Sequence, residues 1–254
     1  MEIQESSFEI DFACDQSDEL ILIGDIHGYA DLLDALLERA SNIPRHPGRD
    51  RTVVFLGDLI DRGSESIRCL DLAIGAKARL GCNVIGLLGN HEQFLRIALE
   101  ENGRVSDLAA ANWMRNGGGN VIMELHKKGQ PLDLPEALGE RRLTWLQRLR
   151  SHFVSGDIMA VHAGLNPDVP TAEFLAEPWM VDYGRFREAR HWAWVREPFL
   201  DHQPDPKRGH QGYFVVHGHT PDDVSLEHQL RRCRLNLDGG SYKTGRARML
   251  HLSG

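Results

Sequence analysis

The chain has 254 residues, of which 41% are hydrophobic and 26% charged, and its formal net charge is −8. This composition is typical of a globular protein with a substantial core and argues against intrinsic disorder. The negative balance argues against nucleic acid as a partner, because phosphate backbones are bound by clusters of Lys and Arg. We expect a single domain that spans residues 1–254.

The N-terminus and the cysteines indicate the compartment of the protein. Residues 1–5 have neither a basic start nor a long apolar stretch, and no later run approaches the roughly 20 apolar residues of a membrane span. The four cysteines are scattered, without the paired spacing of a zinc ribbon or a small disulfide scaffold. We therefore expect a soluble, cytoplasmic protein with reduced thiols and no membrane partner.

The first hundred residues repeat one pattern three times. Each repeat is an apolar run that reads as a buried strand, then a loop with glycine and polar residues, then apolar residues at helical spacing. The strands are expected at 20–23, 52–56 and 83–88, and the helices at 30–40, 64–77 and 92–99. The alternation of strand and helix predicts parallel βαβ units and an α/β fold.

The middle of the chain has a different pattern. Helix-forming stretches over 108–115, 121–127 and 143–150 are separated by the glycine run at 117–119 and by prolines such as Pro135. We expect a small helical insert over about 105–150, beside the site rather than in a separate domain.

Strand patterns return in the C-terminal half. Apolar runs at 158–161 and 213–216 end in histidines, and the alternating segments 233–238 and 247–252 predict two closing strands. A turn at Gly239–Gly240 separates these closing strands. We expect Tyr242, just after the turn, to pack rather than to reach the site.

Polar side chains follow five of these strands, at the sheet edge where ligands bind in α/β folds. They are Asp25, His27, Asp58, Asn90, His162 and His219. This oxygen and nitrogen set, without a thiolate, suits two divalent ions, with Mn preferred and Fe, Zn, Ni or Co as alternatives. Asp58 on the central strand can bridge two ions that clamp a phosphoryl oxygen. His217 ends the same strand as His219 and could replace it as a ligand.

Five residues are candidates for phosphate binding and proton transfer. Arg62 could place a bidentate fork on the phosphoryl oxygens, and Arg196 is a second candidate from a remote segment. Asn90 is expected to contact phosphate as well as metal. His91 would then act as general acid to the leaving oxygen, with Asp61 as its orienting partner.

These motifs resemble the signature of a known superfamily. The segments Gly24–Gly28, Gly57–Gly63 and Gly89–Glu92, followed by single histidines at His162 and His219, resemble the calcineurin-like metallophosphoesterases. Within them, the chain is similar to the phosphoprotein phosphatases, and most closely to the compact bacterial and bacteriophage lambda type. The resemblance implies a β-sandwich flanked by helices in four α/β/β/α layers.

The resemblance extends to residues 113–119 and 194–197, so it covers nearly the whole chain. It favours His219 over His217 as the ligand. Carried over by position, it implies Asp25, His27 and Asp58 at the first metal, and Asp58, Asn90, His162 and His219 at the second.

Two departures from the family pattern affect the expected substrate. Leu88 stands where the phosphatases usually have an Arg, so one phosphate contact is missing or comes from elsewhere. Pro221 replaces the second ligating His of other metallophosphoesterases, which agrees with the phosphatase branch.

The resemblance implies a phosphomonoesterase in which a hydroxide held by two metals attacks phosphorus without a covalent phosphoenzyme. Its substrate would be a phosphorylated protein, on Ser/Thr or with dual specificity, or a small phosphoester. The alternative is hydrolysis of dinucleoside polyphosphates such as diadenosine tetraphosphate, although those hydrolases tend to lack an Asp at the position of Asp61. A metal-binding module without catalysis is disfavoured because no ligand or dyad position is lost.

Overall fold

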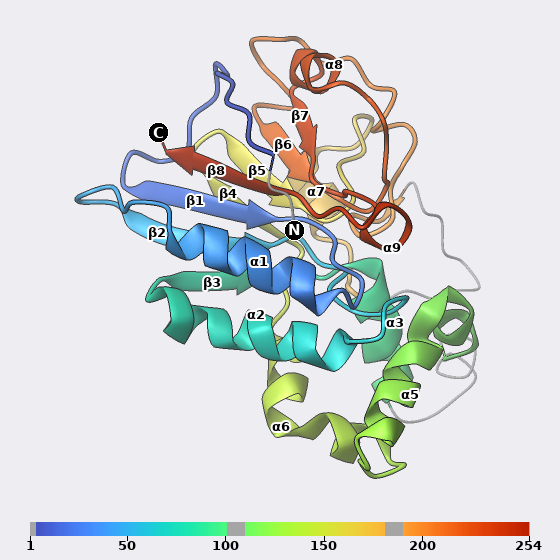
Figure 1. Ribbon diagram of the computed structural model, residues 1–254. Helices are drawn as coiled ribbons and strands as arrows, with labels where there is room; N and C mark the ends of the chain where they lie inside the picture. Colours follow the sequence, from blue (N-terminus) through green and yellow to red (C-terminus); the bar gives the residue numbers. More distant parts are fainter. Residues whose placement is uncertain (1–3, 101–109, 181–189, 254) are drawn as a thin grey trace.

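The computed structural model describes residues 4–100, 110–180 and 190–253, which form two mixed four-stranded sheets flanked by helices (Figure 1). The first sheet has the order β3 (Asn83–Gly86), β2 (Asp50–Phe55), β1 (Asp18–Ile23) and β8 (Met249–Ser253), and only β8 is antiparallel to its neighbour. The second sheet has the order β4 (His152–Ser155), β5 (Ile158–Val161), β6 (Phe214–His217) and β7 (Arg234–Asn236), and only β4 is antiparallel. The expected α/β sandwich is confirmed.

The core lies on both faces of the first sheet. Because successive side chains of a strand point to opposite faces, Leu20 and Leu22 of β1 pack in the cluster between the sheets. Ile21 and Ile23 instead pack against the helices. Helices α1 (Ala30–Ser41), α2 (Ser66–Leu80) and α3 (Asn90–Leu99) follow the three parallel strands, as the periodicity predicts, and α1 and α2 cover the outer face (Figure 1).

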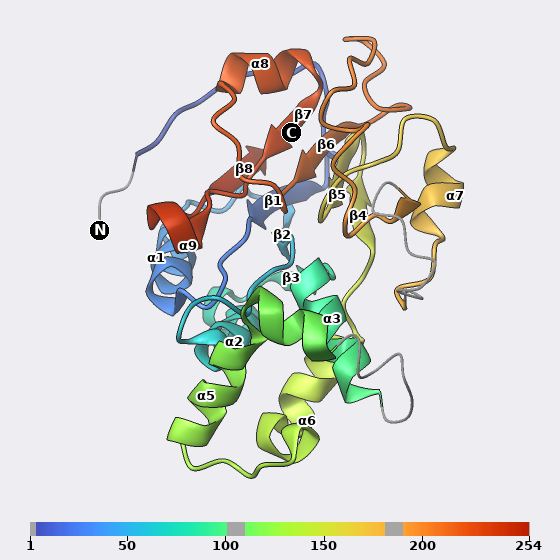
Figure 2. The same ribbon diagram turned by 90° about the vertical axis from the view of Figure 1, so that its right-hand side faces the viewer.

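The predicted insert is mainly helical among its described residues, while its first residues, 105–109, lie outside them. It contains a short π-helical turn (Met114–Gly118), α5 (Gly119–Lys127) and α6 (Leu134–Gln147), of which α5 and α6 project beyond α2 and α3 (Figures 1 and 2). The sequence pattern predicts that Pro135 interrupts the helices, but it does not. It lies in the first turn of α6, where its missing N–H is not needed, and the Asp133 side chain caps that turn.

The two closing strands predicted in the C-terminal part are present. The two closing strands are not neighbours, because β7 belongs to the second sheet and β8 to the first. The short helix α9 (Ser241–Thr244) follows the Gly239–Gly240 turn and lies between them in the sequence. The structure also contains β4, which the sequence pattern does not predict, and the short helices α7 (Thr171–Leu175) and α8 (Leu226–Arg231).

Among the described residues, none of the helices combines the length and the apolar character needed to cross a membrane.

Candidate metal centre and active site

The polar residues that follow the strands gather where the loops of both sheets meet. Each is delivered by the loop after a parallel strand or by the first turn of α3, and each is buried. They are Asp25 and His27 after β1, Asp58 after β2, Asn90 at the start of α3, His162 after β5 and His219 after β6. Parallel strands thus bring together side chains that are far apart in the sequence.

Asp58 occupies the middle of this group. Its Oδ2 lies 3.6 Å from His27 Nε2, and its Oδ1 lies 3.5 Å from His162 Nε2. The ligand atoms fall into two clusters, each within 4.8 Å, which share this carboxylate; His27 and His91 complete one, His162 and His219 the other. One carboxylate facing histidines on both sides is the arrangement of a bridging ligand for two ions.

Backbone contacts fix the Asp58 carboxylate. The N–H of His91, in the first turn of α3, donates to Asp58 Oδ1 at 3.1 Å. The helix can come this close because residue 89 is glycine: a Cβ there would lie 2.2 Å from the same oxygen. Burial alone would raise the pKa of Asp58, but the neighbouring imidazoles lower it well below its usual value, so the carboxylate is ionised.

The three candidate ligand histidines present lone pairs to the centre. Each uses one ring nitrogen on a backbone carbonyl, which can only accept, so that nitrogen carries the proton and the other is open to a metal. The contacts are His27 Nδ1 to Ile60 O at 3.1 Å, His162 Nδ1 to Leu56 O at 2.8 Å and His219 Nε2 to Trp194 O at 3.2 Å. This hydrogen bonding fits metal ligation.

The remaining ligand candidates surround the same point. Asn90 Oδ1 lies 3.2 Å from His162 Nε2 and 2.9 Å from His219 Nδ1. Asp25 accepts the His219 N–H at 3.0 Å, but it falls outside the two His/Asp clusters. His217, the alternative to His219, points elsewhere: its Nε2 lies 3.0 Å from Arg234 Nη1.

Several carboxylates are buried close together at the site, and this also favours bound cations. Burial, together with the charges of Asp238 and Asp58, raises the pKa of Asp25 well above its usual value. Asp238, which the sequence motifs do not single out, is buried, and its Oδ2 has no hydrogen-bond partner among the described residues. Carboxylates held together away from water are stabilised by a divalent ion, so the residues present fit a dinuclear centre.

His91 and Asp61 form a buried pair beside the centre. His91 Nδ1 lies 2.6 Å from Asp61 Oδ2, and the Trp113 indole N–H donates to both Asp61 oxygens at 2.9 and 3.0 Å. On the other side, Arg62 Nη2 lies 3.1 Å from His91 Nε2. Because a guanidinium only donates, Nε2 accepts and the proton is on Nδ1. Burial lowers the pKa of His91 to about 4, which agrees with this neutral tautomer.

Besides Asp238, two residues of the site are missed by the sequence patterns. The sequence pattern indicates only that Glu92 belongs to a helix. Its carboxylate, however, accepts hydrogen bonds from the backbone N–H groups of Asp58 and Leu59, both at 2.8 Å. These two bonds fix the loop after β2. Tyr242 does reach the site, contrary to expectation: the Arg62 guanidinium stacks 4.0 Å above its ring, which meets His27 edge-on at 5.4 Å.

Two sequence positions remain, Arg196 and Leu88. Arg196 is half-buried, and its charge adds to burial in lowering the pKa of His219, which places it near the second cluster. Leu88 is fully buried in the core and offers no contact to phosphate.

Comparison with known proteins agrees with this arrangement. The chain is 32% identical over 162 residues to a symmetrical bis(5'-nucleosyl)-tetraphosphatase of Delftia acidovorans, covering 62% of this chain and 48% of that protein. It is 30% identical over 190 residues to the protein of the same name from Acidovorax ebreus, covering 73% and 57%. The chain thus spans about half the length of the curated relatives it matches.

Solved structures share the fold at low identity. A cold-active protein-tyrosine phosphatase of a psychrophilic Shewanella is 18% identical, with a TM-score of 0.59 over 96% of this chain and 78% of that one. A protein serine/threonine phosphatase from Saccharomyces cerevisiae is 14% identical, with a TM-score of 0.56 over 88% and 67%. The family model for calcineurin-like phosphoesterases matches residues 19–252. The chain therefore belongs to the calcineurin-like phosphoesterase family.

Proposed function

We propose that this protein is a two-metal phosphoester hydrolase whose substrate is a dinucleoside tetraphosphate. The observation that carries the hydrolase proposal is the Asp58 carboxylate between His27 and His162, with the His91–Asp61 pair beside it. The substrate is supported by the relatives named as tetraphosphatases, each of which the chain matches over about half its length. Hydrolysis at the central bridging oxygen adds one water, breaks one P–O bond and yields two nucleoside diphosphates.

Six residues of the chain would hold the two metal ions. Asp25, His27 and Asp58 would hold one ion, and Asp58, Asn90, His162 and His219 the other. When bound, such ions activate a water and neutralise charge on the phosphoryl oxygens.

Arg62 and His91 would act on the substrate itself. Arg62 now donates to His91 Nε2; a bound phosphate would attract the guanidinium to its own oxygens and free that nitrogen. The negative phosphate and Asp61 together favour a second proton on the imidazole, which His91 then delivers to the leaving oxygen. Asp61 keeps the ring oriented through Nδ1. Arg196 is proposed as a second phosphate contact.

A protein phosphatase is the second candidate. The observation that favours it is the Asp61–His91 contact of 2.6 Å, because the resemblance implies that dinucleoside tetraphosphate hydrolases tend to lack this Asp. The buried Leu88, in place of the usual Arg, weighs against it.

Hydrolysis assays with both substrate classes test the proposal. Metal-stripped protein is reconstituted with Mn²⁺ and assayed with diadenosine tetraphosphate and with phosphoserine, phosphothreonine and phosphotyrosine peptides. His91→Ala serves as the inactive variant, and His46→Ala, at an exposed histidine, as its matched control. Preferential ADP release that only His91→Ala abolishes is expected. Turnover confined to peptides would favour the phosphatase, and turnover of neither substrate would refute the hydrolase.

A further inference from the structure

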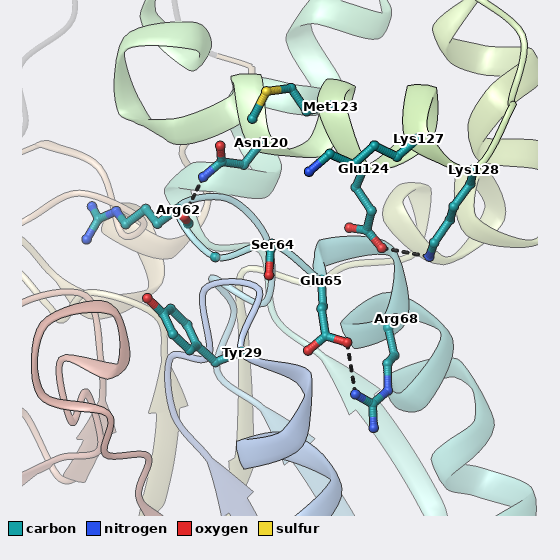
Figure 3. Close-up of a pocket in the computed structure, with 11 residues that line it drawn as sticks. Tyr29, Arg62, Ser64, Glu65, Arg68, Asn120, Met123, Glu124, Lys127 and Lys128 are labelled. Carbon is teal, nitrogen blue, oxygen red and sulfur yellow. Dashed lines mark hydrogen bonds and ion pairs between the residues drawn. The ribbon is translucent and has the colours of Figure 1, made fainter.

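A pocket of about 480 Å³ adjoins the candidate active site (Figure 3). Its walls are Tyr29 from the loop after β1, residues 62–65 from the loop after β2 together with Arg68 of α2, and residues of α5 together with Lys128 just after it. The volume lies within the range of small-molecule sites, roughly 300–1,000 Å³. The metal, phosphate and proton-transfer assignments above leave most of these residues without a role.

Arg62 joins the pocket to the reacting centre. Its side chain reaches His91, while the residue itself lines the pocket. The next residue, Gly63, donates its N–H to His27 O at 2.8 Å, so the pocket wall continues directly into a candidate ligand loop. A group attached to the phosphorus at the centre can therefore extend past Arg62 into the pocket.

The pocket is lined by more cations than carboxylates. Arg68 and Lys128 are neutralised by carboxylates of the lining, whereas no described carboxylate forms an ion pair with Arg62 or Lys127. The neutralised pairs are Arg68 Nη1 with Glu65 Oε1 at 2.9 Å and Lys128 Nζ with Glu124 Oε1 at 2.7 Å. The exposed Lys127 side chain extends along the pocket toward Asn120 (Figure 3). The two unpaired cations suit an anionic ligand.

The other lining groups suit a flat polar ring. Tyr29 presents an aromatic ring on the side opposite α5 (Figure 3). Asn120 donates from Nδ2 to the carbonyl of Arg62, which fixes the orientation of its amide. Its Oδ1 is thereby left to accept, for example from the exocyclic amine of adenine.

We propose that this pocket binds the leaving nucleotide half of a dinucleoside tetraphosphate, with Lys127 on its phosphate and Tyr29 against its base. The proposal rests on the function proposed above and extends it to the recognition of the nucleotide. An acidic phosphopeptide would use the cations alone. The combination of an aromatic ring, an oriented amide and two unpaired cations matches a nucleotide better.

Steady-state kinetics with two substrates test the pocket in the Mn²⁺-reconstituted protein. Diadenosine tetraphosphate is long enough to reach the pocket, whereas p-nitrophenyl phosphate is not. Lys127→Glu should raise KM for the dinucleotide about tenfold, because an attraction becomes a repulsion. Tyr29→Ala should raise it about tenfold through lost base stacking, and Tyr29→Phe should restore wild-type KM. Lys207→Glu, an equal change of charge at an exposed lysine outside the pocket, is the matched control.

The outcomes separate the pocket from the proposed function. If the wild-type enzyme cleaves the dinucleotide and KM is unchanged in both Lys127→Glu and Tyr29→Ala, nucleotide binding in the pocket is refuted. The proposed hydrolase function is then unaffected. Turnover of p-nitrophenyl phosphate without any cleavage of the dinucleotide would refute both the proposed substrate and the proposed role of the pocket. A raised KM for acidic phosphopeptides, with the dinucleotide unaffected, would assign the pocket to a peptide instead. Equal KM changes for both substrates would refute nucleotide binding in the pocket.

Discussion

Asp61→Asn is the substitution that tests the His91–Asp61 pair most directly, because it changes almost no volume. Asp61 is fully buried and accepts from two donors, His91 Nδ1 and Trp113 Nε1. An amide can accept at only one of its two positions. If its oxygen faces His91, its NH₂ meets the indole N–H; if the oxygen faces Trp113, the NH₂ must donate to His91 Nδ1.

The second orientation shifts the His91 proton to Nε2, where it would oppose the Arg62 N–H group 3.1 Å away. Either orientation leaves a buried donor unpaired, at a cost of about 1–3 kcal/mol. A difference of that size between the two orientations would change the population of the productive tautomer by roughly 5- to 150-fold. Loss of the carboxylate charge, which favours protonated His91, adds to it. We expect kcat to fall about 10²–10⁴-fold, the range for a lost general acid.

The assay compares leaving groups in the Mn²⁺-reconstituted wild type, Asp61→Asn and His91→Ala. An alkyl phosphate needs a proton on its leaving oxygen, whereas p-nitrophenolate leaves as a stable anion. Both variants should therefore lose far more kcat with the alkyl phosphate, while their metal content stays at the wild-type value. Equal losses with both leaving groups, or a kcat for Asp61→Asn within about threefold of wild type, would refute the assignment of His91 as general acid.

Three further predictions concern the bridge, the stacked arginine and a buried ion pair. Asp58→Asn should lower both metal content and kcat; two ions per chain in elemental analysis would contradict bridging. Tyr242→Ala should raise KM for p-nitrophenyl phosphate about 2–5-fold, because Arg62 loses its stacking partner, and unchanged KM would contradict this. Burial alone would raise the pKa of Glu19, but hydrogen bonds from Arg51 help lower it from 4.5 to about 2. This contribution to stability is complete above pH 4.5 and is lost as the pH falls through 2. Glu19→Gln should cost about 3 kcal/mol in urea unfolding at pH 7 and flatten that acid dependence, whereas an unchanged pH profile would contradict it.

The parts of the fold that the sequence predicts are those with a local pattern. The strands before Asp25, Asp58 and Asn90 are continuous apolar runs because both faces of the first sheet are covered, and such runs are recognisable without tertiary information. The residues after them must then meet, since parallel strands end at one edge. The positions of most candidate ligands follow from this topology alone.

Features that depend on long-range pairing are not predictable in this way. Strands β7 and β8 alternate like partners of a hairpin, and only the whole fold decides that they join different sheets. Glu92 and Tyr242 are similar cases, because their roles depend on contacts with loops 34 and 180 positions earlier in the chain. A glutamate in a helix or a tyrosine after a turn has no local mark of such a contact.

Backbone conformation gives an argument for function that does not depend on the motifs. Seven non-glycine residues among those described have positive φ, and five belong to the candidate site: His27, Asp58, Asp61, Arg62 and His219, with φ between 51° and 71°. Side chains other than glycine rarely adopt this region, at a cost of order 1–3 kcal/mol each, although Asp and His tolerate it better than Arg. Backbone hydrogen bonds between the loops, such as His27 N–H to Asp58 O at 2.9 Å, impose these angles. Glycine would relieve the strain at every one of the five positions but would remove the carboxylate, imidazole or guanidinium. Stability alone therefore does not account for the residues found there, which supports their proposed roles in metal and phosphate chemistry.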